Sequence, residues 1–242
     1  LAMEIQGVPF ENIEPLRQFL KEEAGLETGG TGAKVRPVTA CKGTTCQYGL
    51  IDTYALSEKI HERFYVGYHD VKLPHKFKIA VGGCPNNCLK PDLNDVGIVG
   101  QWVPHVKEEL CKGCKLCEKE CPMGMAKVED GKASINTQGF NHCGRCIRKC
   151  PFEAIETQTN GYLVYLGGRW GKRTAVGRPL SVIISSEEEV LALVEKCILL
   201  FKAYGQPKER FADTVTRLGF EKVQEMLLSN ELLERKEEIL AQ

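Results

Sequence analysis

Cysteine is the residue type whose number and spacing point most directly to chemistry in this chain, which contains 12 of them in 242 residues. All but Cys197 fall into two groups: a pair of short motifs and, after them, a dense run. Thiolates are soft ligands that suit zinc, copper(I) and iron–sulfur clusters. The grouping therefore predicts metal-centre chemistry. Cys197 lies beside the apolar stripe of a predicted helix and is expected to be a buried small hydrophobe.

A disulfide framework is the alternative explanation for so many cysteines. Disulfide scaffolds belong to short secreted domains. This chain is long, and its first residues, LAMEIQGVPFENIE, have neither the basic start nor the apolar run of a signal peptide. No stretch reaches the roughly 18 apolar residues that a membrane span needs. We therefore expect reduced thiols in a cytoplasmic protein.

The dense run carries the most specific pattern. It consists of Cys111-x2-Cys114-x2-Cys117-x3-Cys121-Pro122 and, further on, Cys143-x2-Cys146-x3-Cys150-Pro151. Close spacing on a tight turn lets three thiolates converge on one cubane, while the cysteine before proline is directed to a different cluster. Four-cysteine zinc sites also use short spacings. The first run is nevertheless far more typical of iron–sulfur proteins than of zinc proteins.

Residues 109–156 resemble the bacterial two-cluster ferredoxin. By that resemblance, one [4Fe–4S] cluster is held by Cys111, Cys114, Cys117 and Cys150, and the other site contains Cys121, Cys143 and Cys146. Where the ferredoxin pattern begins its second run with cysteine, this chain has Phe140. The second cluster therefore lacks a ligand unless Asn141, His142 or water serves. It is otherwise [3Fe–4S], or it has been lost.

The other group comprises Cys41-x4-Cys46 and Cys84-Pro-Asn-Asn-Cys88, and each pair follows a predicted strand. Two strand ends side by side in one sheet would bring the four thiolates together. In their contexts, VRPVTACKGTTC and KFKIAVGGCPNNC, the pairs resemble the sirohaem–[4Fe–4S] motif of the sulfite and nitrite reductases. The likeness continues through DVGIVG, GYLVYLGGRWGK and the ERF–RLG segment.

This resemblance implies that Cys41, Cys46, Cys84 and Cys88 hold one cubane and that Cys88 bridges to the iron of sirohaem. The family's first pair usually has five intervening residues, whereas this chain has four, a change that a loop of glycine and threonine can absorb. The resemblance also implies cofactor contacts from the two cysteine loops, through Thr44, Thr45, Asn86 and Asn87.

Reduction of sulfite or nitrite needs positive charge beside the oxyanion and protons for the departing water. Lys76 and Lys78 alternate on one strand, so both side chains point to one face. By resemblance they match basic residues that contact the substrate. Arg36 is a candidate for the substrate or a sirohaem carboxylate. A second basic cluster lies on a glycine-rich turn and comprises Arg169, Lys172 and Arg173. Any one of these could instead be a solvated surface charge.

The remaining pattern predicts the elements that position these residues. Apolar periodicity favours helices over 12–25, 50–65, 185–201 and 207–218, with Asn12 and the Ser185/Glu188 pair as N-terminal caps. Strands are expected over 34–40, 77–81, 95–102 and 161–168, and a link, TGGTGA, precedes the first of them. We therefore predict an α+β fold: a sirohaem-reductase-like mixed sheet with helices, formed by residues 1–108 and 157–242, with a small ferredoxin-like module inserted at 109–156.

Two functions remain open. The resemblance implies a sirohaem-dependent reductase of sulfite to sulfide or of nitrite to ammonia, with electrons entering from a donor protein through the inserted module. Many family members contain two related halves with sirohaem between them, so this chain would pair with a second copy or a sister subunit. The alternative is an electron-transfer subunit without its own catalytic haem. Lys plus Arg equals Asp plus Glu, 32 of each, so no overall field attracts nucleic acid.

Overall fold

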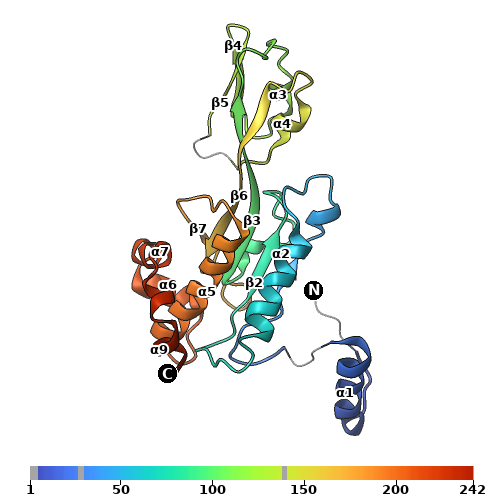
Figure 1. The fold of residues 1–242 in the computed structure, drawn as a ribbon, viewed down its shortest axis with the longest axis vertical. Coiled ribbons are helices and arrows are strands. Elements are labelled where there is room, and N and C mark those ends of the chain that lie inside the picture. The colour runs from blue at the N-terminus through green and yellow to red at the C-terminus, as the bar shows by residue number, and fades with distance from the viewer. Residues whose placement is uncertain (1–4, 27–29, 138–140, 242) are drawn as a thin grey trace.

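The computed structural model describes residues 5–26, 30–137 and 141–241. Figure 1 shows an elongated molecule with a central body of sheet and helices, a narrow module at one end and helix α1 (Ile13–Ala24) standing apart at the other. Part of the predicted TGGTGA link and the position of Phe140 lie outside the described residues. None of the described helices is both long and apolar enough to cross a bilayer.

One mixed sheet forms the centre of the body, and within the described residues its strand order is β1-β2-β3-β6-β7. The strands are β1 (Thr39–Ala40), β2 (Ile79–Gly82), β3 (Val96–Val106), β6 (Ile155–Leu166) and β7 (Arg178–Pro179). The first three run parallel, β6 runs antiparallel to β3, and β7 runs antiparallel to β6. The mixed sheet predicted from the sequence is therefore confirmed.

Helices cover the sheet (Figure 1). They are α2 (Thr53–Ile60), which continues as the π-helix η3 (His61–Val66), and the C-terminal set α5 (Glu187–Tyr204), α6 (Phe211–Leu218), α7 (Phe220–Leu228), α8 (Glu231–Glu234) and α9 (Lys236–Ala241). Short 3-10 turns are η1 (Phe10–Asn12), η2 (Gly43–Thr45) and η4 (Pro91–Leu93). Phe77, Phe201 and Phe211 meet in the core with ring centroids 5.1–5.8 Å apart, and all three are fully buried. Such contacts join the sheet to α5 and α6.

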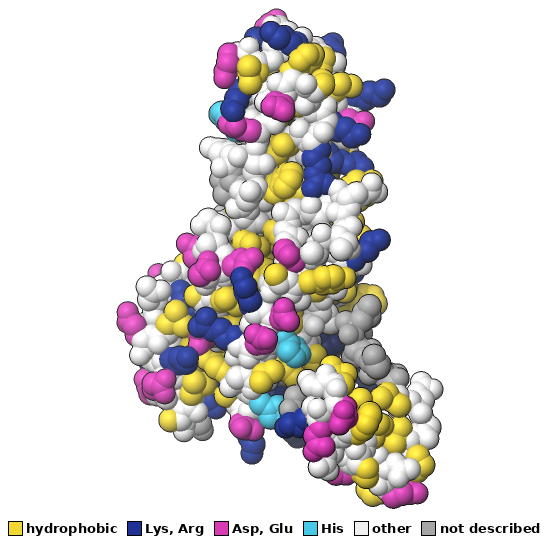
Figure 2. Space-filling model, turned by 45° about the vertical axis from the view of Figure 1, so that its right-hand side comes forward, with side chains coloured by type: hydrophobic (Ala, Val, Ile, Leu, Met, Phe, Trp, Pro, Cys, Tyr) yellow, Lys and Arg dark blue, Asp and Glu magenta, His cyan; other side chains and the backbone are white. Residues whose placement is uncertain are grey.

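The module at the far end contains α3 (Leu116–Glu120), α4 (Arg145–Lys149) and a two-stranded antiparallel sheet, β4 (Ala126–Glu129) with β5 (Lys132–Ile135). The long strands β3 and β6 leave the central sheet and run up to its base, with a β-bulge between Val103 and Pro104. Its small core includes the thiols of Cys117 and Cys146. Lys and Arg side chains gather along one side of the module in Figure 2.

Several element boundaries differ from the predicted ones. The strand predicted over 34–40 is reduced to β1 because Pro37 has no N–H to donate to a ladder. Helix α5 is capped by Ser186, whose hydroxyl accepts from the Glu189 N–H at 3.2 Å, so the N-cap lies one residue later than in the predicted Ser185/Glu188 pair. The Glu189 carboxylate accepts from the Ser185 N–H at 3.1 Å. β6 starts at Ile155 rather than residue 161, because it also pairs along the arm to the module.

Two further helices also depart from expectation. Helix α6 begins at Phe211 rather than near Pro207, because Lys208 takes a positive φ of 69° that breaks a right-handed helix. Asn12 makes no side-chain cap, since η1 already leads into α1. The predicted apolar stripe of α1 is present but not buried: Ile13 is 42% and Phe19 59% exposed. Cys197, by contrast, is fully buried as predicted.

Candidate metal centres and oxyanion site

The first two cysteine pairs lie at one edge of the sheet. Strands β1 and β2 are parallel neighbours, with Ala40 beside Val81. The Cys41 N–H donates to the Val81 carbonyl at 3.0 Å, which holds the start of one cysteine loop against the end of the neighbouring strand. Because parallel strands present their carboxyl ends together, loops 41–46 and 84–88 lie side by side. The strand pairing expected from the sequence is present.

Electrostatics shows that these four thiols share one environment. Burial raises the pKa of the Cys84 thiol. The charges of three other thiols raise the pKa of Cys84 further: Cys41, Cys46 and Cys88. We call these four residues the thiol quartet. Four thiolates this close repel one another unless a cationic centre binds them, which is what a metal cluster supplies.

Two glycines allow the loops to approach. The Gly83 N–H donates to the Cys41 Sγ at 3.1 Å. A Cβ at Gly83 would lie 2.7 Å from the Gly43 Cα, and one at Gly43 would lie 2.8 Å from the Gly83 Cα. Glycine is therefore needed at both positions for this backbone contact. The donor set, thiols from two loops with a backbone N–H on one sulfur, fits an iron–sulfur cluster.

No three His, Cys, Asp or Glu side chains in the described parts of the chain converge closely enough to hold a single metal ion. A cubane makes a different demand, because each of its iron atoms takes one thiolate and the ligands need not converge on a single point.

The other residues of these loops that were predicted to contact the cofactor differ in exposure and in whether their side chains already form hydrogen bonds. The Thr44 hydroxyl donates to Asp52 at 2.8 Å and so belongs to the start of α2. The Thr45 hydroxyl donates to the Lys42 carbonyl at 3.4 Å. Asn86 is exposed, while the Asn87 Oδ1 is buried without a hydrogen-bond partner in the described structure. Cys88 is the exposed thiol of the quartet.

The module holds two further groups of thiols. A small pocket in the module is lined by the four cysteines that the ferredoxin resemblance groups together: Cys111, Cys114, Cys117 and Cys150. The Ala133 N–H donates to the Cys111 Sγ at 3.3 Å. Burial raises the pKa of Cys117, and the charges of Cys111 and Cys114 add to that shift. This group is the distal thiols.

The second group lies nearer the body and comprises Cys121, Cys143 and Cys146, which we call the proximal thiols. Burial raises the pKa of Cys146 to about 12, and the charges of Cys143 and Cys121 contribute to the shift. The Met125 N–H donates to the Cys121 Sγ at 3.3 Å. Phe140, which replaces a cysteine here, lies outside the described residues. Asn141 has a buried Oδ1 with no hydrogen-bond partner among the described residues.

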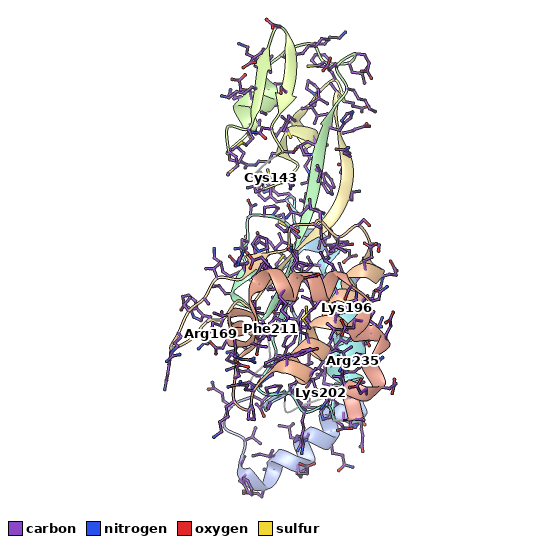
Figure 3. All side chains as sticks on the ribbon, turned by 90° about the vertical axis from the view of Figure 1, so that its left-hand side faces the viewer. Cys143, Arg169, Lys196, Lys202, Phe211 and Arg235 are labelled. Atoms are coloured by element: carbon purple, nitrogen blue, oxygen red, sulfur yellow. The ribbon has the colours of Figure 1, made fainter. Side chains whose placement is uncertain are left out.

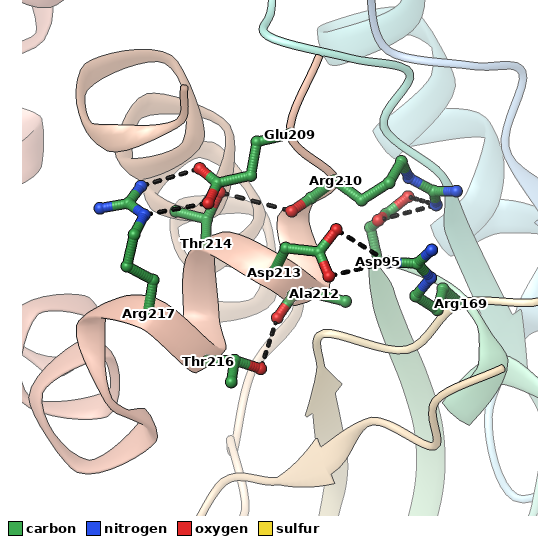
Figure 4. A network of polar contacts seen from close by, with 9 residues as sticks. All are labelled: Asp95, Arg169, Glu209, Arg210, Ala212, Asp213, Thr214, Thr216 and Arg217. Carbon is green, nitrogen blue, oxygen red and sulfur yellow. Dashed lines mark hydrogen bonds and ion pairs between the residues drawn. The ribbon is translucent and has the colours of Figure 1, made fainter. Parts of the chain in front are cut away.

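The predicted substrate lysines belong to a basic cluster that the structure places elsewhere. Burial lowers the pKa of Lys76, and the charges of Arg210, Lys78 and Arg36 lower it further. At the centre of this cluster lies Asp95, which is fully buried. Asp95 accepts from the Lys78 N–H at 2.9 Å. It also accepts from the Arg210 guanidinium at 3.0 Å (Figure 4).

The sequence patterns did not identify two members of the basic cluster. Arg210 lies in the ERF segment without any spacing that marks it, and His75 has no ligand spacing that would suggest a role. The His75 Nδ1 accepts from the Lys76 N–H at 2.7 Å. Burial and then the charge of Arg210 lower the pKa of His75, which favours the neutral ring. Its position directly before Lys76 is the sequence feature that could have identified His75.

The remaining predicted cations are partly engaged within the chain. The Arg36 guanidinium donates to the Gly30 carbonyl, and Arg169 donates to both carboxylate oxygens of Asp213 at 2.8 Å. Lys172 and Arg173 are exposed. A cavity of about 250 Å³ lies between this loop and α6; its charged lining residues are Arg169, Arg173, Arg178 and Asp213.

The basic cluster and the thiol quartet lie at opposite ends of β2. Lys78 precedes the strand and the Cys84 loop follows it. The four extended steps from Lys78 to Gly82 span roughly 13 Å at about 3.3 Å per residue. One chain therefore does not bring the predicted substrate residues and the quartet together.

Comparison with known proteins identifies the family of this chain. Residues 31–236 match the family described as the nitrite and sulphite reductase 4Fe-4S domain. The chain belongs to this family. It is 34% identical over 222 residues to the coenzyme F420-dependent sulfite reductase of Methanocaldococcus jannaschii, covering 90% of this chain and 35% of that protein. It is 32% identical over 191 residues to a subunit of the anaerobic sulfite reductase of Salmonella typhimurium, covering 69% of this chain and 53% of that one.

The fold of this nitrite and sulphite reductase 4Fe-4S domain is also found in a solved relative. The crystal structure of dissimilatory sulfite reductase I superposes with a TM-score of 0.70 at 23% identity, covering 90% of this chain and 57% of that one. The chain thus spans about a third of the F420-dependent protein and about half of the other two. These proteins contain substantial portions outside the matched region.

Proposed function

We propose that this chain is the cluster-bearing part of a sirohaem-dependent reductase that takes sulfite to sulfide or nitrite to ammonia. The observation that carries the proposal is the thiol quartet at the shared edge of β1 and β2, in a chain of the nitrite and sulphite reductase 4Fe-4S family. Two independent loops supply its thiols, as a cubane site requires.

In this proposal the quartet, Cys41, Cys46, Cys84 and Cys88, ligates one [4Fe–4S] cluster. Cys88 is exposed, so its sulfur can face a second centre outside the loop. Sirohaem, when bound, supplies an iron that accepts the oxyanion and the electrons. Further cofactor contacts would come from Thr45, Asn86, Asn87 and the basic turn with Arg169, Lys172 and Arg173. Thr44 would act indirectly, by fixing the loop to α2.

We assign residues 109–156 as a ferredoxin-like module inserted between residues 1–108 and 157–242. The grouping of its thiols supports this assignment. The distal thiols would hold a [4Fe–4S] cluster. The proximal thiols would hold an incomplete or [3Fe–4S] cluster, because Phe140 stands where a fourth cysteine would be. Electrons from a donor protein would enter here. A reducing cytoplasm would keep these cysteines available as cluster ligands.

The basic cluster would bind the oxyanion and return protons. Lys76 and Lys78 would face the substrate, with Arg36 beside them. The lowered pKa of Lys76 makes its proton easier to transfer than that of an ordinary lysine. Asp95 and Arg210 would hold this end of β2 in place without touching substrate.

A second chain is needed because one chain separates the quartet from the basic cluster. In a symmetric pair, each site would take the quartet from one copy and the basic cluster from the other. A sister subunit could fill the same place. The Salmonella relative is named as a subunit, and so by name is part of a larger assembly.

The same separation favours one alternative function, an electron-transfer subunit without its own haem. A visible spectrum of anaerobically purified, fully reconstituted protein, with iron and acid-labile sulfide counts, distinguishes the two. The reductase is expected to show a Soret band and a long-wavelength band in addition to the cluster absorption. A broad brown shoulder alone would identify the carrier. A reduced methyl viologen assay with sulfite and with nitrite then identifies the substrate.

A further inference from the structure

Trp102 lies at the junction between the body and the module, on β3. Its backbone N–H donates to the His142 carbonyl at 2.9 Å, and it forms an isolated parallel bridge with Cys143. A Cβ at Gly144 would lie 2.9 Å from the Trp102 ring, so the indole packs directly on the loop that carries a proximal thiol. Figure 3 shows Cys143 at the base of the module, next to the body.

On its other side Trp102 connects to the thiol quartet. The indole Nε1–H donates to the Leu50 carbonyl at 3.2 Å, and the Leu50 N–H donates to the Gly83 carbonyl at 2.8 Å. The Gly83 N–H in turn donates to the Cys41 Sγ at 3.1 Å. A continuous path of covalent and hydrogen bonds thus runs from the residue before Cys143 to a sulfur of the quartet.

Arg148 holds the two sides of this junction together. It lies on α4, the helix that contains Cys146, and its guanidinium donates to the Gly49 carbonyl at 2.6 Å and to the Gln47 carbonyl. The same guanidinium lies 4.8 Å from the centroid of the Trp102 ring. The Gly49 N–H donates to the Cys46 carbonyl at 2.9 Å. Arg148 therefore ties the loop after a quartet cysteine to the helix that carries a proximal thiol.

We propose that Trp102 and Arg148 are the positioning residues of the electron-transfer contact between the proximal thiols and the thiol quartet. This inference rests on the proposed function. One electron, supplied by a one-electron donor such as reduced viologen, leaves the cluster at the proximal thiols, which is oxidised. It enters the cluster at the quartet, which is reduced; no bond forms and no proton moves. Tunnelling weakens steeply across gaps without bonds, so the hydrogen-bonded path and the fixed separation favour this route.

The order of the centres follows from this contact. The proximal thiols include Cys143, which lies against Trp102 at the base of the module, so they would pass the electron to the body. The distal thiols would receive it first. The incomplete site would therefore be an obligatory step in transfer, and a [3Fe–4S] or cysteine-poor cluster there would still be functional.

Four variants of the full, reconstituted chain test the proposal. Trp102→Phe removes the indole N–H and keeps an aromatic ring, while Trp102→Leu removes both. Arg148→Ala removes the tie to Gly49, and Lys149→Ala is the matched control, because it removes an exposed charge from the same helix. Iron and sulfide counts, electron paramagnetic resonance of the reduced protein and stopped-flow reduction of the quartet cluster are measured for each.

We expect Trp102→Leu and Arg148→Ala to keep their iron but to lose the magnetic interaction between the module clusters and the quartet cluster. Reduction of the quartet cluster should slow by about tenfold or more, as loss of a supporting contact around a metal site typically does. Trp102→Phe should fall between them and the parent chain, and Lys149→Ala should match the parent. Unchanged magnetic interaction and rate in Trp102→Leu would overturn the proposal.

Failure of the proposed function looks different. If the parent chain takes up no iron, the proposed function fails, and the contact is tested in the metal-free chain by hydrogen exchange. Arg148→Ala should then speed exchange at the Leu50 and Trp102 amides at least severalfold, with no change in Lys149→Ala. Equal exchange in the two variants would remove the role of Arg148 as the tie.

Discussion

Lys78 presents its ammonium to solvent while its backbone N–H is held by a buried carboxylate. The pair of Asp95 and Arg210 thus fixes the strand without using up the charge of the lysine. A binding site for a small anion requires a cation that is fixed in place but not neutralised, and Lys78 meets both conditions.

Replacing Lys76 or Lys78 with Ala should reduce sulfite or nitrite turnover by about a hundredfold or more, in the range seen when a donor to developing negative charge is removed. Iron and sulfide content should stay at the parent level, because both lysines precede β2 whereas the Cys84 loop follows it. Lys72→Ala, an exposed lysine of the same segment, is the control. Loss of iron in Lys78→Ala would instead assign that residue a structural role.

Glu209 gives a pH-dependent prediction at the same scale. Hydrogen bonds from Arg217 at 2.8 and 2.9 Å lower the pKa of Glu209 to about 2, and its side chain is only 13% exposed. Because the folded pKa lies below the unfolded one, this stabilisation is present above about pH 4.5 and disappears as the pH falls toward 2.

Glu209→Gln should therefore lower the free energy of unfolding by about 2 kcal/mol at pH 7, with the difference closing in acid. Urea unfolding of the metal-free chain at several pH values measures it. Glu221→Gln is the matched control, because its ion pair with Arg178 is exposed and should contribute nothing measurable. A difference for Glu209→Gln that did not depend on pH would contradict the ionic explanation.

At the scale of elements, the N-terminus of α5 distinguishes two adjacent serines. Ser186→Ala removes the hydroxyl that accepts from the Glu189 N–H and should lower the free energy of unfolding by about 1 kcal/mol. Ser185→Ala should cost less, because the Ser185 N–H still donates to the Glu189 carboxylate at 3.1 Å. Thermal unfolding of the two variants side by side provides the measurement. A larger loss of unfolding free energy in Ser185→Ala would support the Ser185/Glu188 cap predicted from the sequence.

Much of the thiol arrangement could be predicted from local patterns, because a cysteine loop directly after an apolar strand inherits the position of that strand's end. The pairing of β1 with β2 follows this rule. The contact between Arg210 and Asp95 could not be found in this way, since 115 residues separate them and no spacing rule links them. Nor does the alternation of Lys76 and Lys78 reveal that the Lys78 N–H donates to Asp95.

At the scale of the whole molecule, the separation of quartet and basic cluster predicts complementation between two inactive variants. If sites form between two copies of the chain, Cys84→Ser and Lys78→Ala should each be inactive alone. Refolded together, they should recover up to about a quarter of the parent activity, because half of the pairs are mixed and each mixed pair has one complete site. Activity measured after co-refolding, with separately refolded samples mixed afterwards as the control, checks this. No recovery would point to a sister subunit.

The pairing of Val106 with Ile155 is the last rung of the ladder between β3 and β6 before the module begins. The chain therefore leaves the sheet after Val106 and returns at the residue paired with it, Ile155. A two-residue Asn-Gly turn could replace residues 107–154 without moving either strand. The shortened chain should fold and bind about four iron atoms, as one remaining cubane requires. Iron counts and circular dichroism would check it. A module attached in this way can be inserted or deleted as one unit without changing the sheet that carries it.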